Sequence, residues 1–171
     1  MKKTFALLLA LCLMLSGAAL AEYDLTWEQV TASLEENNVN LSGEFYTFNE
    51  IAVAIFIPEG FTQVQAPNDT FIGYFMTEEG SAIGLQYVNA NGMDLETYTA
   101  GLSGAGATEI ETGTVNGLPC VSYEMPANKT VNVAFTTEAG YVLEVICGPM
   151  ETEEDKQAAS IIMASIQTVS E

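Results

Sequence analysis

The sequence contains no histidine and no arginine, and its four lysines stand against 23 aspartate and glutamate residues. Serine triads, cysteine–histidine dyads and histidine-based zinc sites all require an imidazole near neutral pH, so the composition excludes these chemistries. A positive patch that neutralises phosphates cannot be built from so few lysines. We therefore expect no nucleic acid and no anionic membrane surface as a partner.

Catalytic patterns that do without histidine are also weak here. Serine acylation could use a lysine as base, but Lys129 falls in a predicted turn and Lys156 in an acid-rich helix start, and neither position buries an amine. The glycine run 101–106 ends a predicted helix and does not follow a strand, so it is no phosphate-binding loop. Paired carboxylates alone can hydrolyse a glycoside, yet among 23 acids any two can approach each other. We expect no enzyme, and an unrecognised hydrolase is the third hypothesis.

The chain begins with the pattern of a cleavable secretory signal peptide. Lys2 and Lys3 precede an apolar run of 11 residues, and small residues at Ala19 and Ala21 suit signal peptidase. The run is shorter than the roughly 20 residues that span a bilayer. The pattern resembles bacterial signals and predicts residues 1–21 as the signal peptide, with cleavage after Ala21 and a secreted or extracytoplasmic product.

Cleavage bears on both anchoring and charge. A lipid anchor needs a cysteine directly after the small residues, whereas Cys12 lies inside the apolar run, so we expect no lipidation. Loss of Lys2 and Lys3 leaves 23 acids against two lysines, a formal charge of −21. This charge favours cationic ligands or divalent metals; the alternative is a solvated surface that keeps copies of the protein apart.

The hydrophobic pattern predicts an α+β domain, an antiparallel β-sheet flanked by helices, over residues 44–171, preceded by an N-terminal helical segment over 22–43. The run 51–57 is apolar at nearly every position, which predicts an inner strand covered on both faces. The predicted helices begin at N-cap Thr26, at Asn91-Gly92 and at Thr152, and the predicted strands cover 45–48, 51–57, 71–76, 81–88, 108–115, 118–125, 130–137 and 141–147.

One short segment recurs along the chain. Residues 75–80 and 135–140 match at four of six positions, and each contains a predicted hairpin turn. An internal duplication and repeated turn chemistry both explain the match.

Two cysteines, Cys120 and Cys147, remain after cleavage, and export would permit a disulfide between them. If residues 118–147 form an up-down-up meander, a strand separates them, and the turns place Cys120 opposite Phe135 and Cys147 opposite Thr130. That arrangement puts the two Cα atoms well beyond the roughly 7 Å limit for a disulfide. We therefore expect no disulfide, unless the strand order differs from a meander.

Three carboxylates are weak metal candidates. Glu151, Glu154 and Asp155 lie three and four residues apart on one face of the last predicted helix, and hard oxygen ligands suit Ca²⁺ or Mg²⁺. The alternative is that acids in the first turn after N-cap Thr152 offset the unpaired N–H groups of the helix terminus. No other cofactor is expected.

Several segments resemble PsbP-like domains, the superfamily that includes the extrinsic photosystem II subunit and bacterial DcrB-type lipoproteins. The strand 51–57 followed by Pro58-Glu59-Gly60-Phe61 is similar to the opening of that domain. The other similar segments are a mid-chain helix (94–98), a central hairpin (115–123), a late strand (140–143) and a closing helix (161–166).

The resemblance covers about residues 44–169 and implies an α/β/α sandwich with scaffolding or binding roles. The chain lacks the histidines that bind metal in the photosynthetic branch, so no functional residue is carried over. The first hypothesis is a secreted, non-catalytic binding or interaction module for an unknown protein or small ligand, and the second is a carboxylate-based Ca/Mg-binding protein. Exposed aromatic residues, such as Trp27 or Tyr46, would favour the first; a deep cleft with two inward carboxylates would favour a hydrolase.

Overall fold

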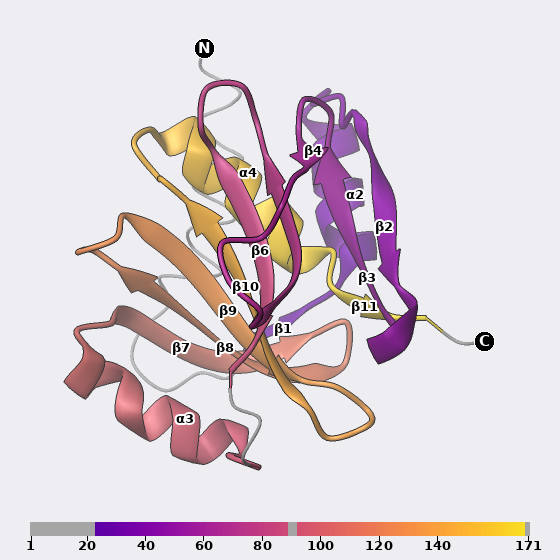
Figure 1. Ribbon diagram of the computed structural model, residues 1–171. Coiled ribbons are helices and arrows are strands. Elements are labelled where there is room, and N and C mark those ends of the chain that lie inside the picture. Colours follow the sequence, from indigo (N-terminus) through magenta and orange to yellow (C-terminus); the bar gives the residue numbers. More distant parts are fainter. Residues whose placement is uncertain (1–22, 89–91, 170–171) are drawn as a thin grey trace.

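The computed structural model describes residues 23–88 and 92–169 (Figure 1), and the predicted signal peptide lies outside these residues. The α+β class with a mostly antiparallel sheet is confirmed. No helix in the described part of the chain has the length and apolarity needed to cross a membrane. In chain order the elements are β1 (Tyr23–Leu25), α2 (Trp27–Glu36), β2 (Gly43–Phe48), η1 (Asn49–Ile51), β3 (Val53–Pro58), β4 (Thr62–Gln63), β5 (Phe71–Met76), β6 (Ala82–Tyr87), α3 (Leu95–Leu102), η2 (Ser103–Ala105), β7 (Thr108–Val115), β8 (Leu118–Met125), β9 (Thr130–Thr136), β10 (Val142–Gly148), α4 (Glu153–Ala164) and β11 (Gln167–Thr168).

The described strands form a large and a small sheet. The large sheet has eight strands in the order β1-β7-β8-β9-β10-β6-β5-β4, and the small one has three in the order β11-β3-β2. All pairings are antiparallel except β1 with β7. The meander of β8, β9 and β10 that the sequence predicts is therefore present, and β3 is the inner strand of the small sheet.

The main core lies between one face of the large sheet and the layer formed by the small sheet and α4. Alternate residues of β8, β9 and β10 point into this core, as the two-residue period of a strand requires. Phe135, Leu143 and Val145 are fully buried there against Ile162 and Ile166 from the C-terminal segment. Helix α2 covers the outer side of the small sheet, so this N-terminal helix acts as a sheet cover (Figure 1).

The other face of the large sheet carries α3. Leu95, Tyr98 and Leu102 of this helix pack with Val121 and Tyr123 of β8, which lie on the face opposite the main core. Helix α3 contacts β8 and β9, and β5 and β6 lie farther along the same sheet (Figure 1).

The structure differs from the sequence prediction mainly at short elements and at boundaries. Strands β1, β4 and β11 are two or three residues long, too short to show a two-residue period, and were not predicted. Helix α3 begins after N-cap Asp94, whose carboxylate accepts from Thr97 N at 2.8 Å, and not at Asn91-Gly92; Asn91 itself lies outside the described residues. The apolar spacing of the last predicted helix placed Ala158 in the core, but in α4 Ala158 is half-buried, whereas Ala159 and Ala164 are buried.

The recurring segments form turns with the same hydrogen bonds. Thr77 N donates to Ser81 O at 2.9 Å, and Ser81 N donates to Thr77 Oγ1 at 3.2 Å. Thr137 and Tyr141 repeat the pair at 2.9 and 3.1 Å. The shared sequence therefore accompanies shared turn chemistry, with a glycine of positive φ at the same position of each turn.

Asn116, in the turn between β7 and β8, joins three segments that are distant in sequence. Its Oδ1 accepts from Trp27 N at 2.7 Å, and its Nδ2 donates to Ala164 O at 2.8 Å and Ile166 O at 2.7 Å. Its backbone N–H donates to Leu25 O at 2.8 Å. Its φ of 48° lies in the left-handed region, which asparagine tolerates well.

Asn116→Gly is expected to lower the free energy of unfolding by about 2 kcal/mol, because it removes three side-chain hydrogen bonds and keeps the backbone conformation accessible. Asn116→Ala is expected to lower the free energy of unfolding by about 1 kcal/mol more than Asn116→Gly, because alanine is disfavoured in the left-handed conformation. Urea unfolding of both variants measures the two contributions. Asn128→Gly, in the exposed β8–β9 turn, is the matched control; a loss at Asn116 no larger than at Asn128 would contradict the role of Asn116 as a link.

Candidate functional site

A surface pocket of about 690 Å³ lies between the two sheets, at the end where β9 turns into β10. The small sheet contributes the start of β3 and the end of β11, η1 lies between β2 and β3 on the same wall, and the large sheet contributes the β9–β10 turn. The residues that line the pocket are Asn49, Glu50, Ile51, Ala52, Val53, Thr137, Glu138, Ala139, Tyr141, Thr168 and Val169.

Backbone hydrogen bonds hold both walls of this pocket in place. Ala52, with φ 52°, connects η1 to β3, and its carbonyl accepts from Val169 N at 2.9 Å. On the opposite wall, Thr137 is buried and its backbone and hydroxyl both bond to Tyr141. A left-handed alanine costs about 1–2 kcal/mol, so the surrounding contacts determine this conformation. These hydrogen bonds therefore order both walls of the pocket.

One lining residue of the pocket, Tyr141, belongs to an aromatic pair. Tyr141 is 49% exposed, and its ring meets that of Tyr87 on β6 at a centroid distance of 5.9 Å and an interplanar angle of 78°. This edge-to-face arrangement is the favoured geometry for aromatic pairs. The two tyrosine rings, which we call the aromatic corner, are thus nearly perpendicular to each other. Much of the Tyr141 side chain stays exposed to solvent.

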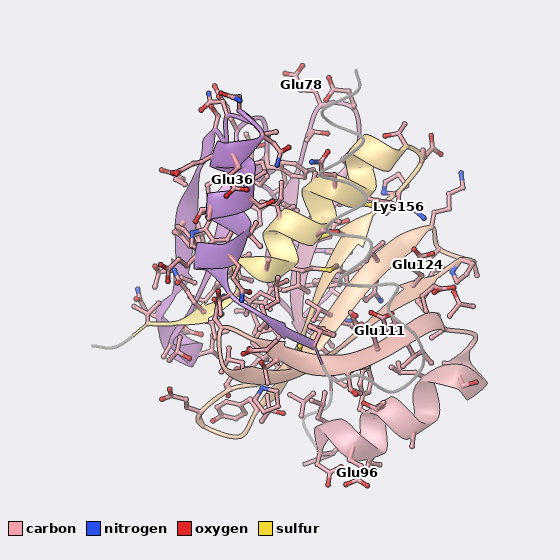
Figure 2. All side chains as sticks on the ribbon, turned by 180° about the vertical axis from the view of Figure 1, so that it is seen from behind. Glu36, Glu78, Glu96, Glu111, Glu124 and Lys156 are labelled. Carbon is pink, nitrogen blue, oxygen red and sulfur yellow. The ribbon has the colours of Figure 1, made fainter. Side chains whose placement is uncertain are left out.

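The charge that lines the pocket is negative. Glu50 and Glu138 are both exposed there, and no lysine is among the lining residues of the described chain. Lys129 lies at the other end of β9, roughly 23 Å away by strand rise, and pairs with Glu151 at 2.7 Å. Lys156 pairs with Glu124 at 3.3 Å on the side of the molecule that Figure 2 shows. The two lysines therefore do not offset the charge of the pocket.

A second polar cluster lies under α3. The carboxylate of Glu144 on β10 is only 4% exposed. Its Oε1 accepts from the hydroxyl of Tyr123, from Tyr98 at 3.2 Å and from Asn132 Nδ2 at 3.1 Å, and its Oε2 accepts from Gln86 Nε2 at 2.8 Å. These donors come from strands β6, β8 and β9 and from α3, so only the tertiary fold assembles the cluster.

The protons of this cluster can be assigned. Each phenol has one proton, and Tyr123 donates its proton to Glu144. Tyr98 therefore shares its single proton between the Tyr123 hydroxyl at 2.6 Å and Glu144 Oε1 at 3.2 Å. Burial and the nearby Glu144 carboxylate raise the pKa of Tyr98 to about 12 and that of Tyr123 still further. Both phenols therefore keep their protons at neutral pH. With both carboxylate oxygens engaged, Glu144 serves to hold α3 on the sheet.

Neither place offers the acid pair of a glycoside hydrolase. A general acid in such enzymes needs a buried carboxyl group with a free proton to give to the leaving group. Glu50 and Glu138 are exposed, and Glu144 is saturated with donors from the protein.

The weak metal candidates lie at the start of α4. Glu151 pairs with Lys129, and Asp155 Oδ2 accepts from Thr152 N at 2.8 Å and Thr152 Oγ1 at 2.9 Å. These hydrogen bonds lower the pKa of Asp155 and complete a capping box. The side chain of Glu154 lies outside the description, and among the described residues no group of three potential ligands could hold a metal ion. The contacts favour the helix-capping alternative, and metal binding stays a prediction.

Cys120 and Cys147 are buried free thiols in the main core, on strands separated by β9. Cys120 lies opposite Phe135 as predicted, but Cys147 lies opposite Val131 and not Thr130, because Val142 pairs with Thr136 and the register counted from this pair reaches Val131. Four residues still separate the two positions along β9, about 13 Å. The geometry behind the expectation of no disulfide is thus present, and that expectation stays a prediction.

The aromatic residues proposed from sequence as surface candidates are packed. Trp27 lies against Phe45 and Phe56, and Tyr46 lies against Phe48 and Phe75. The exposed tyrosines are instead Tyr87 and Tyr141, which occupy strand ends next to turns. Sequence reasoning missed them because exposure at a strand end depends on what the other sheet covers.

No family model and no curated protein sequence matches the chain. Among solved structures, the chain is similar to the solution structure of cyanobacterial PsbP (CyanoP) from Synechocystis sp. PCC 6803, with a TM-score of 0.52 and 9% identity over 75% of this chain and 94% of that one. Two crystal structures score lower: the Ran-binding protein Mog1p of Saccharomyces cerevisiae (TM-score 0.43, 15% identity, 76% of this chain and 97% of that one) and a protein of Bacteroides thetaiotaomicron VPI-5482 (0.46, 10%, 77% and 50%). The PsbP-like resemblance of the fold is thus confirmed over part of the chain.

Proposed function

We propose that this protein is a secreted, non-catalytic binding module that takes its ligand in the pocket between the two sheets. The observation that carries the proposal is the pocket itself: its volume lies in the range of about 300–1,000 Å³ typical of small-ligand sites. Its walls combine apolar surface from Ala52 and Val169 with polar groups from Thr137 and Glu138. Such a mixture gives both affinity and orientation to a small ligand.

The other parts of the proposal follow from the same features. Cleavage after Ala21 would release the domain outside the cytoplasm, where its highly acidic surface keeps it soluble. We also propose that the fold belongs to the α/β/α sandwiches, with α3 over one face of the large sheet and α4, together with the small sheet, over the other. The absence of histidine supports a role without catalysis.

Titration of the processed protein with a panel of cationic, neutral and anionic fragments, followed by ¹H–¹⁵N NMR, tests the site. We expect at least one fragment class to shift the amide signals of residues 49–53 and 137–141. Ala139→Trp fills the pocket and should abolish these shifts, whereas Ala127→Trp, in the exposed β8–β9 turn, should leave them intact. Shifts that survive Ala139→Trp, or a panel without any response at these residues, would refute the proposed site.

A further inference from the structure

We propose that the ligand of this pocket is a small organic cation of the alkylammonium class, held over the ring of Tyr141 and beside the carboxylate of Glu138. The inference rests on the proposed function, because it names the ligand class of the same pocket. It draws on three independent features of the described residues: an open aromatic ring, a negative lining and the lack of a metal-ligand cluster.

The aromatic corner supplies the first feature. A cation within about 6 Å of a tyrosine ring centroid is attracted by the electrons of the ring face. Tyr141 lines the pocket and is in edge-to-face contact with Tyr87, and 49% of its surface remains exposed to solvent. Both backbone polar groups of Tyr141 are hydrogen-bonded to Thr137, so Tyr141 loses little conformational entropy when a ligand binds.

Charge selects the sign of the ligand. Glu50 and Glu138 line the pocket, and both lysines of the described chain are paired with glutamates elsewhere. An anion would meet these two carboxylates without a compensating cation, whereas a cation would meet attraction from both the carboxylates and the ring.

The chemistry of the lining separates an organic cation from a metal ion. Ca²⁺ takes six to eight oxygen ligands, and no group of three potential metal-ligating side chains occurs among the described residues. The pocket instead offers apolar surface from Ala52 and Val169, which suits the methyl or methylene groups of an alkylammonium ion. A pocket of about 690 Å³ accommodates such a ligand with its substituents.

Choline and its neutral isostere 3,3-dimethyl-1-butanol test this inference, because they have nearly the same shape and differ in charge. In NMR titrations of the processed protein at constant ionic strength, set with NaCl, we expect choline to shift the signals of residues 137–141 with a dissociation constant on the order of millimolar. The neutral isostere should bind at least tenfold more weakly. Tyr141→Leu, which keeps an apolar side chain, should weaken choline binding about tenfold.

Charge variants complete the experiment. Glu138→Gln should weaken choline binding about threefold at low salt and less at high salt, because screening reduces the contribution of an exposed charge. Glu96→Gln, on the distant α3 (Figure 2), is the matched control and should bind as the native protein does. Melting temperatures of all variants verify folding.

The outcomes separate this inference from the proposed function. Equal binding of choline and its neutral isostere would overturn the cation assignment and leave the pocket as a binding site. Tighter binding of a lysine tripeptide than of choline would overturn the small-ligand assignment in favour of a basic protein segment. If neither choline nor any fragment of the wider panel binds at these residues, both proposals fail.

Discussion

Glu144→Leu is expected to lower the free energy of unfolding by about 4 kcal/mol, the largest effect that we predict for a single side chain. The substitution removes the acceptor shared by Tyr123, Asn132 and Gln86 and leaves these donors without partners in a region that water does not reach. For a domain of about 150 residues this loss corresponds to a fall in melting temperature of roughly 8–16 °C. Urea and thermal unfolding measure it.

Two further variants locate the origin of this loss. Glu144→Gln keeps the shape and one acceptor oxygen, so its cost should be about half as large. Glu96→Leu, at an exposed position of α3, should change the stability by less than about 0.5 kcal/mol. A double-mutant cycle of Glu144→Gln with Tyr98→Phe should give a coupling energy above about 0.5 kcal/mol, because the two side chains are in contact. Additive effects would show that Glu144 does not hold α3 through Tyr98.

Alkaline pH is expected to destabilise the protein through its buried thiols. Burial raises the pKa of Cys147 to about 12 and that of Cys120 to about 11, from an ordinary value of 9.0. Between the ordinary and the raised pKa, the unfolded chain loses the thiol proton while the folded chain keeps it, so deprotonation favours unfolding. The stability is therefore complete below pH 9 and falls by about 1.4 kcal/mol per pH unit for each thiol, until the pH reaches the raised pKa.

Urea unfolding in a reducing buffer from pH 7 to 11 measures this slope. Cys147→Ala should lower the stability at pH 7 because it leaves a small cavity. Above pH 9 the stability of this variant should fall less steeply with pH, by the contribution of one proton to the slope. Val145→Ala, at a fully buried position on the same strand, is the control that creates a cavity without removing a thiol. It should shift the whole profile without changing its slope. A count of two free thiols in denatured, unreduced protein establishes the starting state, and equal slopes for both variants would contradict the role of Cys147.

Local patterns in the sequence were sufficient for the elements that carry their own signals. The capping box of Thr26 and Gln29 begins α2, and Asn116-Gly117 closes the hairpin of β7 and β8, both as predicted. The continuous apolar run of β3 correctly indicated a strand covered on both faces. These signals depend on neighbours within a few residues, so no knowledge of the fold is required to read them.

The candidate site could not be predicted in this way. Tyr141 and Tyr87 become a corner only because β10 pairs with β6, and the pocket exists only because η1 and β11 of the small sheet stop beside the β9–β10 turn. Glu144 looks like any other acid in the sequence, and five elements must meet before its donors surround it.

The sequence by itself thus determined the class of the fold, its helix starts and turns, and the chemistries that a chain without histidine excludes. It also determined the sign of the charge, and hence the sign of the ligand that we propose. Only the tertiary structure decided which of the 23 acids is buried, which tyrosines remain exposed and where a pocket opens. The physical reason is that capping, turns and periodicity are properties of neighbouring residues, whereas burial and pocket shape depend on strand pairings and sheet packing between residues far apart in the chain.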